Sequence, residues 1–169
     1  MEFSKLVEQR RSCRKYVPCD VKKEDIEEIV KCALMAPSWK NSETGRYYVA
    51  LDEKTIKEVY DCLPDFNQDS SKNAAYIIAT FKKGISGNGD DNWGSYDLGL
   101  QNSYLLLKAS ELGYDTLIMG LRDEDKLRKI FNIPSDEIML PIIAIGKRDG
   151  DLRLNPRKDL KEVLTIKWE

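Results

Sequence analysis

The sequence of 169 residues contains no histidine. This absence excludes zinc sites built from Cys and His, catalytic triads that need His, and imidazole general bases. No C-x-x-C pair occurs among its four cysteines either, so we interpret these as ordinary reduced thiols: Cys13, Cys19, Cys32 and Cys62. Any chemistry must therefore rest on other side chains or on a cofactor.

Long hydrophobic runs and a strong net charge are also lacking. The longest apolar stretches, such as "YIIAT" and "LPIIAIG", fall far short of the ~20 residues that cross a bilayer, and the N-terminus lacks the zones of a signal peptide. A net charge of -2 gives no general attraction to nucleic acid or to an anionic membrane. With 41% hydrophobic and 33% charged residues, we expect a cytoplasmic globular protein with one domain over residues 1–169.

Hydrophobic periodicity predicts most of the helices and strands. Apolar residues recur every three or four positions from Lys22 to Met35, which is the pattern of an amphipathic helix. Residues 96–112 carry apolar side chains around much of the helical circumference and so predict a largely buried central helix. In the last strand, Pro141 implies an edge or a bulge. The other expected elements are helices at 4–10, 54–63 and 123–131 and strands at 46–51, 74–81, 115–119 and 139–146.

A cluster of cations occupies the stretch "EQRRSCRKY" at residues 8–16. Guanidinium groups bind oxyanions in pairs and a hydroxyl adds a hydrogen bond, so this stretch is suited to a phosphate. The alternative is a solvated cationic stretch. A nucleic-acid contact is disfavoured by the acidic balance and by the lack of interleaved aromatic residues beyond Tyr16. A second cationic cluster follows in the tail, at Arg153, Arg157 and Lys158.

Two other stretches have unusual composition. The loop "APSWKNSETG" at residues 36–45 offers short amide and hydroxyl groups that can bind a polar ring edge, although Pro, Ser, Asn and Gly are also what an inert loop contains. The tail ends in "LTIKWE", an apolar segment with too little chain of its own to pack against. We expect a partner surface to receive it.

In order along the chain, four stretches resemble the signatures of the FMN-dependent nitroreductase family. These are "RRSCRKY", "APSWKNS", "DLGLQNSYLLLKASELGYDTLIMG" and "LPIIAIGKRDGDLRLNPRKDLKEVL". The resemblance implies an α+β fold with three layers, helix/sheet/helix, around a mostly antiparallel sheet of four or five strands. It also implies an intertwined homodimer with two sites in the dimer interface.

The resemblance further implies a set of FMN-binding residues. Arg10, Arg11, Ser12 and Arg14 would hold the phosphate, the ribityl chain and the pyrimidine edge, and Arg157 and Lys158 would return from the tail to the same phosphate. Pro37, Ser38 and Asn41 would reach the flavin from the partner subunit. Ile118, Met119 and Gly120 would pass close to the isoalloxazine ring, although a core strand end is the alternative interpretation of this segment.

The implied activity explains the missing histidine. FMN itself accepts hydride from NADH or NADPH and passes it to a nitroaromatic, a quinone or another small electron acceptor in a ping-pong cycle, so no metal, protein nucleophile or general base is needed. A flavin-binding protein with little or no turnover stays open as an alternative. The chain is short for the family, and Glu43-Thr44-Gly45 replaces the usual Gln-Pro-Trp. No nucleic-acid or membrane partner is expected.

Overall fold

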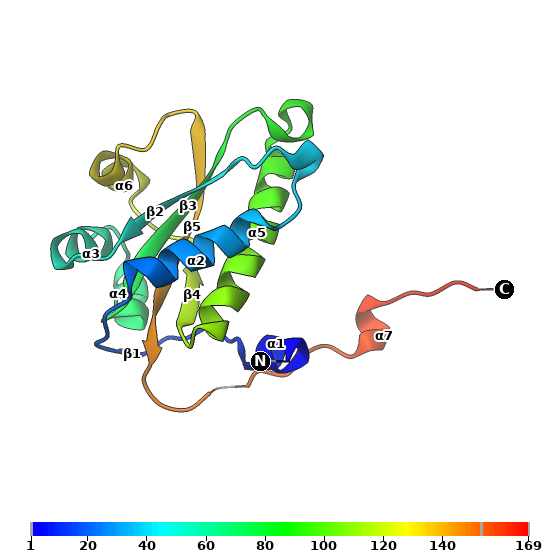
Figure 1. Cartoon of the computed structure of the whole chain (residues 1–169), viewed down its shortest axis with the longest axis horizontal. Coiled ribbons are helices and arrows are strands. Elements are labelled where there is room, and N and C mark those ends of the chain that lie inside the picture. The colour runs from blue at the N-terminus through cyan, green and yellow to red at the C-terminus, as the bar shows by residue number, and fades with distance from the viewer. Residues whose placement is uncertain (1, 153, 169) are drawn as a thin grey trace.

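The computed structural model describes residues 2–152 and 154–168 (Figure 1). Arg153 of the second cationic cluster lies outside the described residues. The helices are α1 (Phe3–Gln9), α2 (Lys23–Leu34), α3 (Glu53–Tyr60), α4 (Asp65–Ser71), α5 (Asp91–Glu111), α6 (Glu124–Phe131) and α7 (Leu160–Val163), with short 3-10 helices η1 (Trp39–Asn41) and η2 (Ser86–Gly89). The strands are β1 (Tyr16–Val17), β2 (Gly45–Ala50), β3 (Ala75–Lys82), β4 (Asp115–Met119) and β5 (Glu137–Arg148).

The strands of the described residues form one five-stranded sheet. Its order is β1-β5-β3-β2, with β4 paired to β5, and every pair of strands is antiparallel. The strand β5 is central, because Ile143 lies opposite both Ile77 of β3 and Ile118 of β4. The predicted α+β class with a mostly antiparallel sheet of four or five strands is confirmed.

Pro141 lies inside the central strand β5. The register of β5 against β3 shifts between the pairs Ile78–Ile142 and Thr80–Met139, which leaves two residues on β5 opposite one on β3. Such a bulge tolerates a residue that has no N–H to give to the ladder. The predicted bulge is therefore present, and β5 is a central strand rather than an edge.

Alternate residues of β3 enter two separate cores. Tyr76 and Ile78 pack with residues of α3 and α6, whereas Ile77 packs with residues of α2 and α5. Figure 1 shows α2 and α5 over one face of the sheet and α3 and α6 over the other. The three-layer helix/sheet/helix arrangement follows from this alternation, since each face of a strand buries its own apolar set.

The long helix α5 is buried in the core, as its sequence pattern predicts. Leu98 and Leu105 have no exposed surface. At Gly94 an added Cβ would lie 2.4 Å from Cε2 of Phe81, so glycine lets α5 approach β3 closely. The helix begins before residue 96 because the Asp90 side chain accepts a hydrogen bond from the second residue of the helix and caps it.

The sequence pattern does not predict α4 or β1. The helix α4, "DFNQDSS", has almost no apolar residues to reveal a period, and it is held to a distant turn by the Asn67 amide, which donates to Leu121 O at 3.2 Å. The strand β1 has two residues, with Tyr16 opposite Arg148 of β5. Neither element has enough local signal, because each depends on contacts with distant parts of the chain.

The C-terminal arm, residues 154–168, extends away from the body (Figure 1). Every residue of this arm is exposed, and its apolar side chains make up much of the exposed apolar set: Leu154, Leu160, Val163, Leu164, Ile166 and Trp168. Over the described residues, no helix combines the length and apolar character needed to cross a membrane.

Tyr76 is expected to make the fold sensitive to alkali. Burial raises the pKa of Tyr76 from 10.0 to about 12. Because the folded pKa lies above the unfolded one, this contribution to stability is fully present below the unfolded pKa of 10.0 and is lost as the pH rises through about 12. Between those limits the free energy of unfolding should fall by up to about 1.4 kcal/mol per pH unit for this group.

Urea unfolding of the wild type and of Tyr76→Phe at several pH values measures this slope. In the variant, the free energy of unfolding should fall less steeply with pH, by the contribution of one titrating proton. This difference is expected whatever the stability of the variant at neutral pH. Equal slopes for both proteins would contradict the assignment.

Candidate functional site

The segment from Arg10 to Arg14 runs along the strand β4. Ser12 forms a parallel bridge with Thr116, and the Cys13 N–H donates to Thr116 O at 2.9 Å. Cys13 is buried, so its neighbours Ser12 and Arg14, which alternate with it in extended backbone, are exposed. The cationic stretch thus follows the short helix α1 and lies along the edge of the sheet, with the side chains of Ser12 and Arg14 turned outward.

Three arginines from the two ends of the chain lie near enough for their charges to interact. Burial, followed by the positive charges of Arg11 and Arg157, lowers the pKa of the Arg10 guanidinium. Among the described residues, none of these three arginines forms an ion pair within 4.0 Å. Arg11 Nη1 donates to the carbonyls of Val7 and Arg10, and its buried Nε has no partner there. Like charges gathered without carboxylates favour the binding of an anion.

Arg14 connects this cluster to the end of β4. Together with Ile118, Met119 and Gly120 it lines a cavity of about 270 Å³. Ile118 is 50% exposed, whereas the Met119 side chain is 3% exposed and packs in the core. The structure therefore brings together the two predicted segments, 10–14 and 118–120. The Met119 side chain thus belongs to the core, as the alternative interpretation of this segment expected. Only the backbone of Met119 can contact a ligand in the cavity.

The third predicted segment lies at the other end of α5. The Trp39 N–H donates to Asp97 near the start of that helix, whereas α1 packs near Lys108 and Glu111 at its end. The 14 residues from Asp97 to Glu111 correspond to ~21 Å along the axis. Pro37, Ser38 and Asn41 are therefore not brought to the arginine cluster within one chain, which is the arrangement expected if they serve a partner subunit.

The loop that carries Ser38 and Asn41 is tied together by Glu43. The Asn41 amide donates to Glu43 Oε1 at 2.8 Å, and Ser38 Oγ accepts from the Glu43 N–H at 3.1 Å. Lys40, Asn41 and Glu43 all have positive φ angles, of 47°, 54° and 46°. Such backbone conformations are costly for residues other than glycine and are often found at functional sites. Glu43 thus organises this loop.

Lys158 stands next to Arg157 at the start of the arm and is exposed. Within the described residues it forms no ion pair within 4.0 Å. Its predicted role at the phosphate stays a prediction.

Comparison with known proteins establishes the family. The model of the nitroreductase family matches residues 7–79 and 63–147, which together exceed half of the chain. The chain belongs to the nitroreductase family. A provisionally named NADH dehydrogenase/NAD(P)H nitroreductase of Archaeoglobus fulgidus is 27% identical over 178 residues and covers 99% of each chain.

Solved structures of the nitroreductase family have the same fold. An FMN-dependent nitroreductase of Clostridium difficile is 25% identical, with a TM-score of 0.78 over 96% of this chain and 98% of the other. A nitroreductase family protein from Streptococcus pneumoniae gives a TM-score of 0.86 over 98% and 100% of the two chains, at 17% identity, which shows the fold alone.

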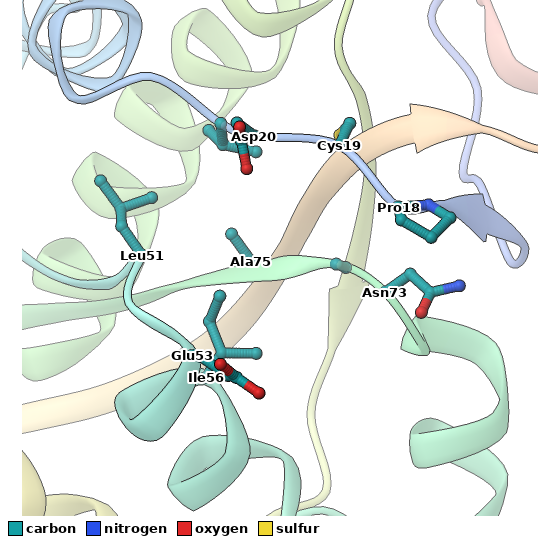
Figure 2. A pocket seen from close by; sticks show the side chains of 10 residues that line it. Pro18, Cys19, Asp20, Leu51, Glu53, Ile56, Asn73 and Ala75 are labelled. Carbon is teal, nitrogen blue, oxygen red and sulfur yellow. The ribbon is translucent and has the colours of Figure 1, made fainter.

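A larger cavity of this nitroreductase family member lies elsewhere (Figure 2). It measures about 850 Å³ and is lined by residues 18–21, 51, 53, 56 and 73–75, none of which the sequence interpretation assigned to a site. Its charged lining groups are Asp20 and Glu53, and no cation among the described residues lines it. A phosphate would meet only like charge there, so size does not identify the site.

The sequence interpretation missed several residues of the cavity at the end of β4. Phe66, Asn67 and Ser70 of α4 line it with Arg14. Asn67 is 6% exposed and its amide donates to Leu121 O at 3.2 Å. Arg148 of β5 lines an adjoining cavity of about 190 Å³ with Ser12 and Arg14. The clustering of amide and hydroxyl groups in "NQDSS" was the available signal, but it is equally typical of a surface loop.

Proposed function

We propose that this chain is an FMN-dependent oxidoreductase that uses NADH or NADPH to reduce a small electron acceptor, with one FMN-binding domain over residues 1–169 and a homodimer as the active form. Its membership of the nitroreductase family supports the oxidoreductase class. The observation that carries the cofactor is the group of Arg10, Arg11 and Arg157, which has no carboxylate partner among the described residues.

The residues present fit the phosphate end of FMN. Two or more guanidinium forks can bind a phosphate dianion through charge-assisted hydrogen bonds, and the exposed Ser12 hydroxyl can add another. The buried Nε of Arg11 lacks a partner in the described chain, as expected for a donor that a ligand satisfies. Arg14 lines the cavities on both sides and would hold the ligand between the phosphate and the ring.

The ring end of the site is formed by Ile118 and Gly120. The half-exposed Ile118 offers an apolar surface for stacking. An added Cβ at Gly120 would have nothing within 4 Å, so the space beside this backbone is open. FMN, when bound, supplies hydride acceptance and donation. The chain supplies position and positive charge from Arg14.

A second copy of the chain would complete the site. Pro37, Ser38 and Asn41 lie at the far end of α5 from the arginine cluster, which supports the proposal that they reach the flavin from a partner subunit. The exposed apolar side chains of the arm offer the surface that would hold the two subunits together. We propose that each arm packs on the partner subunit.

Stopped-flow spectroscopy of the FMN-loaded protein without oxygen tests this function. Rapid bleaching of the flavin by NADH or NADPH, and rapid return of colour on adding p-benzoquinone or nitrobenzene, is expected. Bound FMN that either cofactor bleaches only slowly would favour the alternative, a flavin-binding protein with little turnover. Failure of the apoprotein to bind FMN would overturn the proposal, and strong salt-sensitive binding to DNA or RNA by that protein would replace it.

A further inference from the structure

The turn that follows β4 is fixed at several points. The Leu121 carbonyl accepts from the Asn67 amide at 3.2 Å, and the Asp123 N–H donates to Cys62 O at 2.7 Å. Arg122 Nη1 donates to Gly120 O at 2.5 Å. Ile118, Gly120 and Leu121 are all exposed, so burial in the core does not fix this segment. The hydrogen bonds fix it instead.

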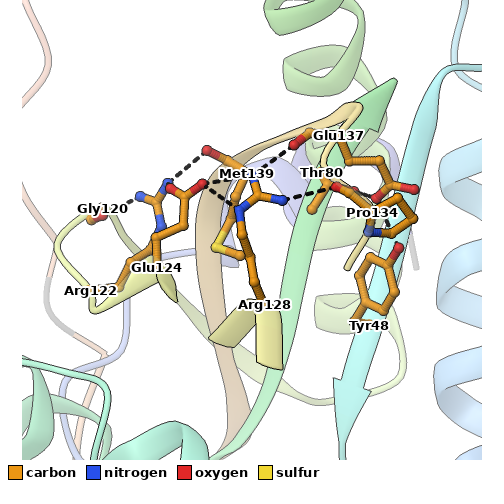
Figure 3. Close-up of polar contacts among 9 residues, drawn as sticks. All are labelled: Tyr48, Thr80, Gly120, Arg122, Glu124, Arg128, Pro134, Glu137 and Met139. Atoms are coloured by element: carbon orange, nitrogen blue, oxygen red, sulfur yellow. Dashed lines mark hydrogen bonds and ion pairs between the residues drawn. The ribbon is translucent and has the colours of Figure 1, made fainter. Parts of the chain in front are cut away.

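Arg122 joins the end of β4 to the central strand. Its Nη2 donates to Met139 O of β5 at 2.7 Å and to Glu124 Oε2 at 2.9 Å, while Nη1 holds Gly120 O (Figure 3). The side chain is 15% exposed. A planar fork that bonds three acceptors from three elements has little freedom to turn. Arg122 therefore fixes the direction of the peptide group between Gly120 and Leu121.

Arg128 supports the same network but does not touch β4. Its Nε and Nη2 donate to Glu124 Oε1 at 3.1 and 2.7 Å, and further bonds reach Pro134 O and Glu137 O. The Glu137 carboxylate is buried and accepts from Tyr48 and Thr80 (Figure 3). Glu124 thus lies between two arginines, of which only Arg122 contacts the candidate site.

We infer that Arg122 is a positioning residue that fixes the peptide group between Gly120 and Leu121 against the flavin and so sets the relative affinity for oxidised and reduced FMN. This inference rests on the proposed function. An oxidised flavin ring presents acceptor nitrogens that backbone N–H groups can bind, and reduction places a hydrogen on one of them. A peptide group held in one orientation binds the oxidised and the reduced flavin with different affinity. A peptide group that is free to turn can bind both forms.

The test compares Arg122→Lys with Arg128→Lys as a matched control. Both variants keep the positive charge and lose a guanidinium group next to Glu124. The midpoint temperature of thermal unfolding of the two apoproteins should therefore be lowered to a similar degree. Fluorescence titration gives the affinity for oxidised FMN, and the two-electron reduction potential of bound FMN gives the ratio of affinities for the reduced and oxidised forms. Glu124→Gln, which loosens Arg122 without removing it, serves as a milder second variant.

The ratio should rise about tenfold in favour of reduced FMN in Arg122→Lys, which is a shift of about 30 mV to more positive potential. Arg128→Lys should stay within about twofold of the wild type, and Glu124→Gln should fall between these results. Equal shifts in the two lysine variants, or an unchanged potential in Arg122→Lys and Glu124→Gln, would overturn the inference while leaving the proposed function in place. A wild-type apoprotein that binds no FMN would overturn both.

Discussion

Arg157→Ala is expected to weaken FMN binding roughly ten- to a hundredfold and to leave riboflavin binding unchanged. Each charge-assisted hydrogen bond contributes about 1.5–3 kcal/mol, and about 1.4 kcal/mol corresponds to a tenfold change in affinity. Riboflavin lacks the phosphate, so an arginine that binds only the phosphate has no effect on it. Arg10→Ala should give the same pattern, because Arg10 and Arg157 lie close enough for the charge of one to lower the pKa of the other.

Fluorescence titration of apoprotein with both flavins at fixed salt measures the two affinities. Lys5→Ala is a matched control, since Lys5 is an exposed cation of α1 that lies outside the arginine cluster. It should change FMN affinity by less than about twofold if general attraction to a charged surface is weak. Equal losses for FMN and riboflavin in Arg157→Ala would show that this arginine supports the fold. Unchanged affinity for both flavins would show that the cationic residues do not bind the phosphate and that residues 8–16 are a solvated cationic stretch.

The fold could be predicted where local pattern and tertiary environment agree. The helix α2 alternates charged and apolar residues at helical spacing, so its sequence determines both the element and its buried face. The strand β3 is buried along nearly its full length and has a continuous apolar sequence to match. By contrast, α4 is polar and β1 has only two residues, so both depend on partners that no local window contains.

Only part of the candidate site could be predicted from the sequence. The resemblance identified Arg10, Arg14 and Gly120 as members of one site, but the bridge from Ser12 to Thr116, which brings them together, joins residues that are far apart in the sequence. Arg122 lies only two residues from Gly120 and carries no motif. Its role depends on Met139 O, a backbone acceptor that any residue could supply, so side-chain identity gives no signal.

Deleting residues 160–169 is expected to convert the dimer to a monomer and to lower FMN affinity tenfold or more. Ile166 and Trp168 are 59% and 84% exposed in the single chain. Burying each large apolar side chain on a partner contributes about 1.5–3 kcal/mol, so the loss of several per arm should exceed what the remaining contacts supply. The deletion keeps Arg157, so the loss of FMN would arise from the missing partner loop that carries Ser38 and Asn41.

Analytical ultracentrifugation at several protein concentrations, together with FMN titration, measures both effects on the same samples. Lys167→Ala is a matched control, because it removes a polar side chain from the same arm and keeps every apolar one. It should remain a dimer with wild-type FMN affinity. A truncated protein that stays dimeric would mean that the arm is not the interface. A wild-type protein that sediments as an FMN-loaded monomer would contradict the shared site itself, because Pro37, Ser38 and Asn41 could then have no part in holding the flavin.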